Sequence, residues 1–86
     1  MADLPDIPVT AAWTVGVAGP AVLNLGSPFM PIWYRVAEST PSAAFGFLLR
    51  SGDTVPVTVP SGKNLYVKST GGGGSGPAIA VAIDGQ

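Results

Sequence analysis

The sequence contains no cysteine and no histidine among its 86 residues. Without cysteine no disulfide can form, and without either residue a zinc or haem site lacks its usual ligands. Folds of this length often depend on such links, because one core in this size range rarely supplies more than about 3–5 kcal/mol of stability. We therefore expect no cofactor and no bound metal. Stability should come from packing and from association.

Charged residues are also scarce, at 10% of the chain, where a usual share is about 25%. The four cations, Arg35, Arg50, Lys63 and Lys68, are scattered, and the net charge is −1. Because nucleic-acid binders normally carry a basic face, we expect no nucleic-acid partner. Hydrophobic residues, in contrast, make up 47% of the chain, more than so small a core can bury. This excess predicts a homo-oligomer, with a trimer favoured, or attachment to a larger body.

Long hydrophobic runs are missing as well. The run around residues 45–49 is far short of the roughly 18 residues that a membrane-spanning helix needs, so we expect no membrane partner. The N-terminal stretch "MADLPDIPV" is acidic and rich in proline, unlike a secretory signal peptide. The sequence therefore predicts a protein made and kept in the cytoplasm of its cell unless something else carries it out.

No catalytic pattern is present, and we expect no catalytic residue. The carboxylates do not pair at a spacing typical of acid and base, and histidine, the commonest general base, is absent. The stretch "PSGKN" at 60–64 resembles the end of a phosphate-binding loop, but it lacks the upstream glycine and has asparagine after the lysine. The stretch "SAAFGFLL" at 42–49 resembles a base-stacking strand but has no basic residue before its aromatics. A turn and a packing strand are the favoured interpretations.

Short strand patterns are what the sequence does contain. Twelve glycines and nine prolines interrupt it every few residues, and no stretch keeps a helical period. Strand signals occur at residues 9–15, 21–25, 29–37, 45–50, 54–60, 65–69 and 78–84. Their number and spacing predict an all-β fold, a compact seven-strand (six to eight) β-sandwich or jelly roll in a single domain.

Alternation within these segments predicts which side chains share a face. In 29–37, one face should carry Met30, Ile32, Tyr34 and Val36, and the other Phe29, Trp33 and Arg35. In 65–69, Leu65 and Val67 should point inward, with Tyr66 and Lys68 outward. The last segment opposes Ile79, Val81 and Ile83 to Ala78, Ala80 and Ala82. Pro31 and Pro56 each remove a ladder donor, so Pro31 predicts an edge or a bulge and Pro56 a strand that is not central.

Residues 1–8 are predicted to form an extended N-terminal arm in front of a sandwich domain at 9–86. Pro5 and Pro8 interrupt any regular ladder there, while Leu4 and Ile7 are apolar anchors that could lie along a neighbouring subunit. A frayed terminus without a role is the alternative. Near the other end, residues 70–77 are predicted to form a flexible glycine-rich hairpin loop, because glycine and serine bury little surface.

Five residues are candidates for subunit or particle contacts: Leu4, Ile7, Trp13, Trp33 and Phe45. Trp13, Trp33 and Tyr34 could instead form a platform for a sugar ring, as aromatic faces do in many small β modules. Such sites usually add several clustered polar side chains, which this chain scarcely has. Packing in the core or at a subunit contact is therefore the favoured interpretation.

One pattern extends over residues 9–84. It combines "AVLNLGS", "YRVAESTPS", "GFLLRSGD" and "VPSGKNLYVK" with a glycine-rich stretch before an alternating last strand. This pattern resembles small β-sandwich structural proteins of tailed bacteriophage virions, found with heads or with fibres and tails. The shared motifs are turns, in which Gly26, Gly52 and Gly62 are expected to adopt angles that other residues avoid.

The resemblance implies a non-enzymatic virion structural protein. The first expectation is a capsid decoration or cement protein, which coats and stabilises a phage head through oligomeric and shell contacts. Its partners would be its own copies and the major capsid protein or another virion protein. The alternative is a tail-fibre, baseplate or receptor-binding component that contacts host surface glycans.

Overall fold

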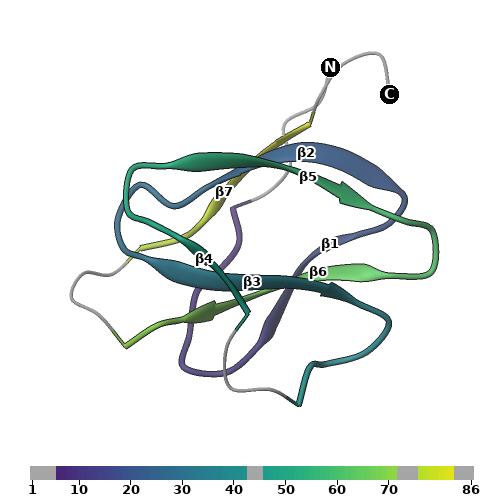
Figure 1. Cartoon of the computed structure of the whole chain (residues 1–86), viewed down its shortest axis with the longest axis horizontal. Coiled ribbons are helices and arrows are strands. Elements are labelled where there is room, and N and C mark those ends of the chain that lie inside the picture. The colour runs from purple at the N-terminus through teal and green to yellow at the C-terminus, as the bar shows by residue number, and fades with distance from the viewer. Residues whose placement is uncertain (1–5, 43–45, 72–75, 83–86) are drawn as a thin grey trace.

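The protein is described by a computed structural model in which residues 6–42, 46–71 and 76–82 are placed. That part of the chain contains seven strands and no helix (Figure 1). The strands are β1 (Thr14–Ala18), β2 (Ala21–Gly26), β3 (Ile32–Ala37), β4 (Phe47–Leu49), β5 (Thr54–Val59), β6 (Asn64–Ser69) and β7 (Ile79–Ala82). The predicted all-β fold with seven strands is confirmed.

The strands form two antiparallel sheets that lie one above the other (Figure 1). One sheet has the order β1-β6-β3-β4 and the other the order β5-β2-β7. Only β3 and β4 are both consecutive and paired, so every other connection passes from one sheet to the other. The prediction of a glycine-rich hairpin at 70–77 is therefore wrong in its pairing. β6 and β7 belong to different sheets, and of that segment residues 72–75 lie outside the described part.

The core lies between the two sheets and follows the alternation of the strands. Its fully buried side chains include Leu23 and Leu25 from β2, Ile32 from β3, and Leu65 and Val67 from β6. The predicted faces of 29–37 are confirmed, because Met30 and Ile32 are buried, Tyr34 and Val36 pack against the core, and Phe29 is exposed. Side chains that alternate along both sheets thus form one shared apolar layer.

The two internal prolines have different outcomes. β5 pairs only with β2 in the described part, so Pro56 lies in an edge strand, as predicted. A proline is tolerated there because its missing N–H faces away from the ladder. Pro31, in contrast, directly precedes β3, which lies between β6 and β4. It marks where the strand begins and not an edge.

The N-terminal segment differs most from expectation. Ile7 is only 1% exposed and belongs to the core cluster. It forms an antiparallel bridge with Ala78, whose two N–H···O distances are both 2.9 Å. Three residues later the carbonyl of Thr10 accepts a hydrogen bond of 2.8 Å from the N–H of Ser69, at the end of β6. This segment therefore passes from the edge of one sheet to the other, and the prediction of a separate arm is wrong at Ile7.

Gly16 provides the room for Ile7. The pairing of β1 with β6 shifts register between Val15 and Val17, which places a bulge at Gly16. A Cβ atom on Gly16 would lie 2.5 Å from Cδ1 of Ile7 and 3.0 Å from its Cγ1 and Cγ2. The bulge and the missing side chain thus create the place where Ile7 closes one side of the sandwich.

Two further expectations need correction. Tyr66 lies on the outward side of β6, as predicted, but its side chain is only 4% exposed and so is covered. Gly52 and Gly62 have φ angles of 86° and 84°, as turn glycines should, whereas Gly26 is not among the glycines with positive φ. Gly26 ends β2 and is buried. Its missing side chain, and not its backbone angle, is what the structure uses.

Candidate interaction surfaces

The predicted contact residues do not lie together. Leu4 and Phe45 lie outside the described residues. Ile7 is buried in the core, so its side chain cannot contact a partner in this structure. Trp13 and Trp33 are half-buried and lie on the outer side of the four-stranded sheet. Of the five candidates, these two are the ones placed on a common surface.

That outer face carries a row of large side chains across the strands. Trp33 on β3 is directly opposite Lys68 on β6 and, on its other side, Leu48 on β4. The Nζ atom of Lys68 lies 5.8 Å from the ring centroid of Trp13, which directly precedes β1. The row therefore runs Trp13, Lys68, Trp33, Leu48, with a cation–π contact at one end.

The aromatic trio considered from the sequence is split between two faces. Tyr34 lies on the inner side of β3 and packs against the core, whereas its neighbour Trp33 lies on the outer side. The next outward row contains Val15, Tyr66 and Arg35, which are paired across β1, β6 and β3. Of this trio, Trp13 and Trp33 lie on the outer face.

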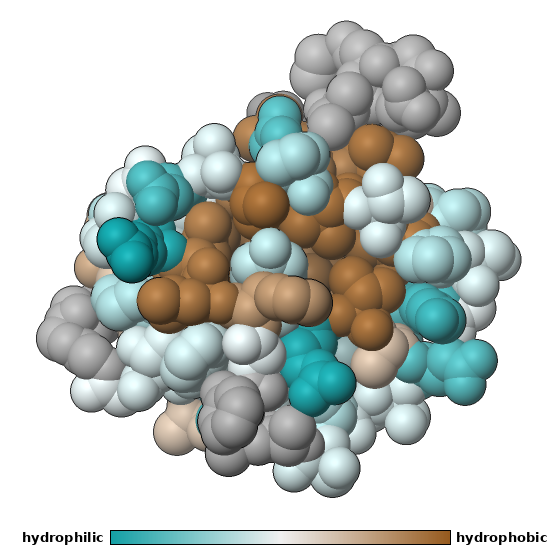
Figure 2. All heavy atoms as spheres, viewed as in Figure 1, coloured by the Kyte–Doolittle hydropathy of each residue, from teal (hydrophilic) through white to brown (hydrophobic). Residues whose placement is uncertain are grey.

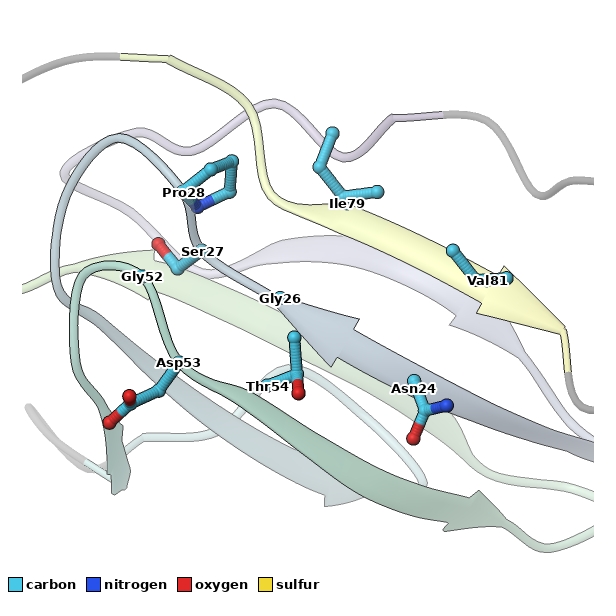
Figure 3. A pocket seen from close by; sticks show the side chains of 9 residues that line it. All are labelled: Asn24, Gly26, Ser27, Pro28, Gly52, Asp53, Thr54, Ile79 and Val81. Carbon is cyan, nitrogen blue, oxygen red and sulfur yellow. The ribbon is translucent and has the colours of Figure 1, made fainter.

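A pocket of about 180 Å³ lies on the outer side of the three-stranded sheet (Figure 3). Its lining comes from β2, β5, β7 and two turns: Asn24, Gly26, Ser27, Pro28, Gly52, Asp53, Thr54, Ile79 and Val81. Gly26 contributes no side chain, and a Cβ there would lie 3.2 Å from Cγ2 of Thr54. Ile79 and Val81 supply the apolar wall from β7. The pocket exists because the centre of this face is a glycine between larger neighbours.

The pocket is apolar because β7 directs its larger side chains outward. Ala78 and Ala80 are buried against the core at 0% and 1% exposure, while Val81 is 40% exposed. The larger β-branched side chains of the strand thus face outward and the alanines face inward. In an ordinary sandwich strand the larger apolar side chains face the core. The outer face of β7 therefore has the composition of a contact surface.

A set of hydrogen bonds fixes the end of the pocket where two turns meet. The buried hydroxyl of Ser27 donates to the carbonyl of Met30. The backbone of Ser27 also accepts from the N–H of Gly52 at 2.8 Å and donates to the carbonyl of Asp53 at 3.3 Å. These contacts hold the β2–β3 turn against the β4–β5 turn. One end of the pocket is thus held by backbone hydrogen bonds.

Among the described residues, β4 carries the most exposed large hydrophobic side chain. Phe47 is 68% exposed, more than Phe29, Val15, Leu48 or Val81. It lies at the edge of its sheet, and its ring contacts Tyr34 with centroids 5.7 Å apart at 38°. Figure 2 shows apolar surface gathered across the middle of this view of the molecule. The sequence analysis treated Phe47 as one of the aromatics of the stretch 42–49 and named Phe45, not Phe47, as a contact candidate.

A second, more polar hollow of about 660 Å³ lies beyond the end of β3. Arg35, Glu38 and Lys63 line it together with serine and threonine hydroxyls of residues 39–42. Among the described residues no group of three or more acidic side chains lies close enough to hold a metal ion. No helix in the described part is long and apolar enough to cross a bilayer.

Comparisons with protein-family models, with curated proteins and with solved structures give no significant match.

Proposed function

We propose that this protein is a non-enzymatic structural component of a phage virion, most simply a decoration or cement protein on the outside of the head. The observation on which the proposal rests is that large apolar side chains lie exposed on the outer faces of both sheets. Val15 and Leu48 lie outward on one sheet and Val81 outward on the other, and they are 51%, 49% and 40% exposed. Outward positions of a free sandwich are normally polar, and exposed apolar groups of this kind mark interaction surfaces.

The proposed partners follow from the same surplus. Apolar groups on both outer faces favour a homo-oligomer, with a trimer as the simplest ring, seated on the major capsid protein or another virion protein. Such permanent contacts are more apolar than transient ones. The place of action would be the virion, with no role for nucleic acid or membrane. The resemblance of the sequence to virion β-sandwich proteins supports this, whereas the sandwich fold by itself serves many functions.

Binding to particles tests the proposal. Purified protein would be mixed with phage heads that lack it and with whole host cells, and the bound fraction would be measured after sedimentation. We expect saturable binding to heads and an increase in their melting temperature. Val15→Asp should weaken binding, and Thr58→Asp, an exposed residue on another strand, should not. Binding to cells and not to heads would contradict a decoration role.

A second candidate is a tail-fibre, baseplate or receptor-binding component that contacts host surface glycans. The observation that favours it is the presence of Trp13 and Trp33 on one face, with Lys68 between them. Indole faces stack on sugar rings, and a neighbouring cation can contact acidic sugars. Tryptophan fluorescence would be measured during titration with host surface polysaccharide. Quenching that is lost in Trp33→Ala would support this role, and an unchanged signal would exclude it for that polysaccharide.

A further inference from the structure

We infer that the outer face of the four-stranded sheet binds an acidic oligosaccharide, which extends from the indoles of Trp13 and Trp33 past Arg35 into the polar hollow beyond β3. The inference rests on the second candidate function and deepens it, because it names the class of glycan and the groups that select it. The ligand is a sugar chain that carries carboxylates, as a polymer of uronic acids does. The polar hollow is the one lined by Arg35, Glu38, Lys63 and the hydroxyls of residues 39–42.

The two indoles are the first argument. Trp13 and Trp33 lie on either side of Lys68 in one outward row, and each is half-buried. Because neighbouring strands are about 4.8 Å apart, the backbone positions of the two tryptophans are separated by about 10 Å. An indole presents a large, flat apolar surface, which matches the C–H face of a sugar ring. Two indoles at this separation can receive two rings of one extended chain, with another ring between them.

The charge of this face is the second argument, and it selects an acidic sugar. Its two outward rows contain two cations and no acidic residue, although the chain as a whole has a net charge of −1. Lys68 lies in the row of the indoles, and Arg35 lies in the next row. The Nζ atom of Lys68 is already held 5.8 Å from the ring centroid of Trp13. A carboxylate on the middle sugar would accept a charge-assisted hydrogen bond from Lys68.

The polar hollow is the third argument, because sugar sites usually add hydrogen-bonding side chains to their aromatic ones. Such side chains are few along the chain, but the fold gathers several of them beyond β3 in a hollow of about 660 Å³. They supply hydroxyls, the carboxylate of Glu38 and the ammonium group of Lys63, which are donors and acceptors for sugar hydroxyls. Arg35 belongs both to the outward rows and to the lining of the hollow, so the two parts of the site are continuous.

The length of the site indicates an oligosaccharide and not a single sugar. Trp33 and Ala37 both lie on β3, and Ala37 lines the hollow. Four residues of a strand extend over about 13 Å, at roughly 3.3 Å per residue. One sugar ring cannot contact the indole of Trp33 and the hollow at the same time. A short chain of linked rings can.

A single-stranded nucleic acid is the other polymer that stacks on aromatic side chains and pairs with cations. Its binding sites usually follow the phosphates with a positively charged groove. Here one cation lies between the indoles, and the hollow adds the carboxylate of Glu38, which repels phosphate. The structure therefore favours a chain whose rings carry hydroxyls as well as charge.

The experiment compares acidic polymers with their own neutral forms. Fragments of polygalacturonate, alginate, hyaluronate and polysialic acid would be titrated into the protein, each beside its methyl ester, which keeps the sugar rings and removes the charge. Binding would be measured by calorimetry and tryptophan fluorescence, with oligo-dT as the nucleic-acid probe. We expect at least one acidic polymer to bind at least tenfold more tightly than its ester and than oligo-dT. Its affinity should fall as the salt concentration rises.

Variants then locate the site. Lys68→Gln and Arg35→Gln should each weaken binding of the acidic polymer at least fivefold and leave binding of its ester unchanged. Trp33→Ala should weaken both forms, and Ser39→Ala combined with Ser42→Ala tests the hollow in the same way. Circular dichroism verifies the folding of each variant. The matched controls, which should bind like the unchanged chain, are two exposed residues outside the outward rows and the hollow, Arg50→Gln and Ser51→Ala.

Four results overturn the inference, and they separate it from the glycan role itself. Equal binding of an acidic polymer and its ester would retain a glycan role but remove the selection for acid. Acidic binding that persists in folded Lys68→Gln and Arg35→Gln would place the site elsewhere. Tighter binding of oligo-dT would assign the face to nucleic acid. If neither form of any polymer binds, the inference and the second candidate function fall together.

Discussion

Replacing Ile7 by alanine should destabilise the fold strongly. Ile7 is 1% exposed, packs on Gly16 and closes the side of the sandwich between β7 and β1. Truncation of a buried isoleucine to alanine costs about 2–5 kcal/mol. We take about 3 kcal/mol, near the middle of this range. In a domain of this size each kcal/mol lowers the melting temperature by roughly 4–8 °C. The expected decrease is therefore about 12–24 °C.

The assay is thermal and urea unfolding at one fixed protein concentration, monitored by tryptophan fluorescence. Asp6→Ala and Pro8→Ala are the matched controls, because both neighbours are exposed. Changes at such surface sites usually stay within about 0.5 kcal/mol. A melting temperature for Ile7→Ala equal to that of Asp6→Ala would refute the core position. It would restore the interpretation of residues 1–8 as an arm that the fold does not need.

Three further substitutions test the local contacts. Gly16→Ala should lower the free energy of unfolding by about 1–3 kcal/mol, because the added methyl overpacks against Ile7. Most of that loss should disappear in the Ile7→Ala background, and a double-mutant cycle would measure this coupling. Ser27→Ala should cost about 1–3 kcal/mol, because the carbonyl of Met30 loses its buried donor; an unchanged urea midpoint would contradict this. Gly62→Ala should cost about 1–2 kcal/mol although nothing lies within 4 Å of the added Cβ, since φ is +84°; a melting temperature equal to that of the unchanged chain would argue against strain.

The strands themselves could be predicted from local patterns. Each has alternating apolar residues bounded by glycine or proline, and the described strands lie inside the predicted segments or within one residue of them, apart from β1. β1 begins at Thr14 and extends to Ala18, so it shares only Thr14 and Val15 with the predicted segment 9–15, and the bulge at Gly16 breaks the alternation beyond that segment. Pro56 correctly marked an edge strand. These features depend on neighbours along the chain, so a single sequence contains them.

Contacts between sheets could not be predicted in the same way. A period of two separates a strand into two faces but does not determine which face is inward. In the segment 78–82 the inward face is the one with the small alanine side chains. Ala78 pairs with the buried Ile7, and both contribute to the core. Tyr66 lies on the outer face of β6 and is nevertheless only 4% exposed. Both outcomes depend on partners that are distant in sequence.

The sequence indicated that apolar side chains would be exposed, but it did not indicate where on the surface they would lie. The hydrophobic content of 47% predicted more apolar side chains than so small a core can bury. It could not locate exposed apolar surface at Phe47 on β4, which is 68% exposed while Leu49 on the same strand is buried. Nor could it locate the pocket, which needs Gly26, Thr54 and Val81 from three strands of one sheet. Residue types are a property of the sequence, whereas their grouping is a property of the topology.

The distribution of the surplus argues for more than one kind of contact. Val15 and Leu48 lie on the outer face of one sheet, Val81 on the outer face of the other, and Phe47 at an edge. A single two-fold interface covers one patch per copy and would leave the remaining faces exposed. Contacts at the edge as well as on both outer faces would be needed to cover all of these side chains. A small chain with no disulfide can thus gain from its neighbours the stability that its own core does not supply.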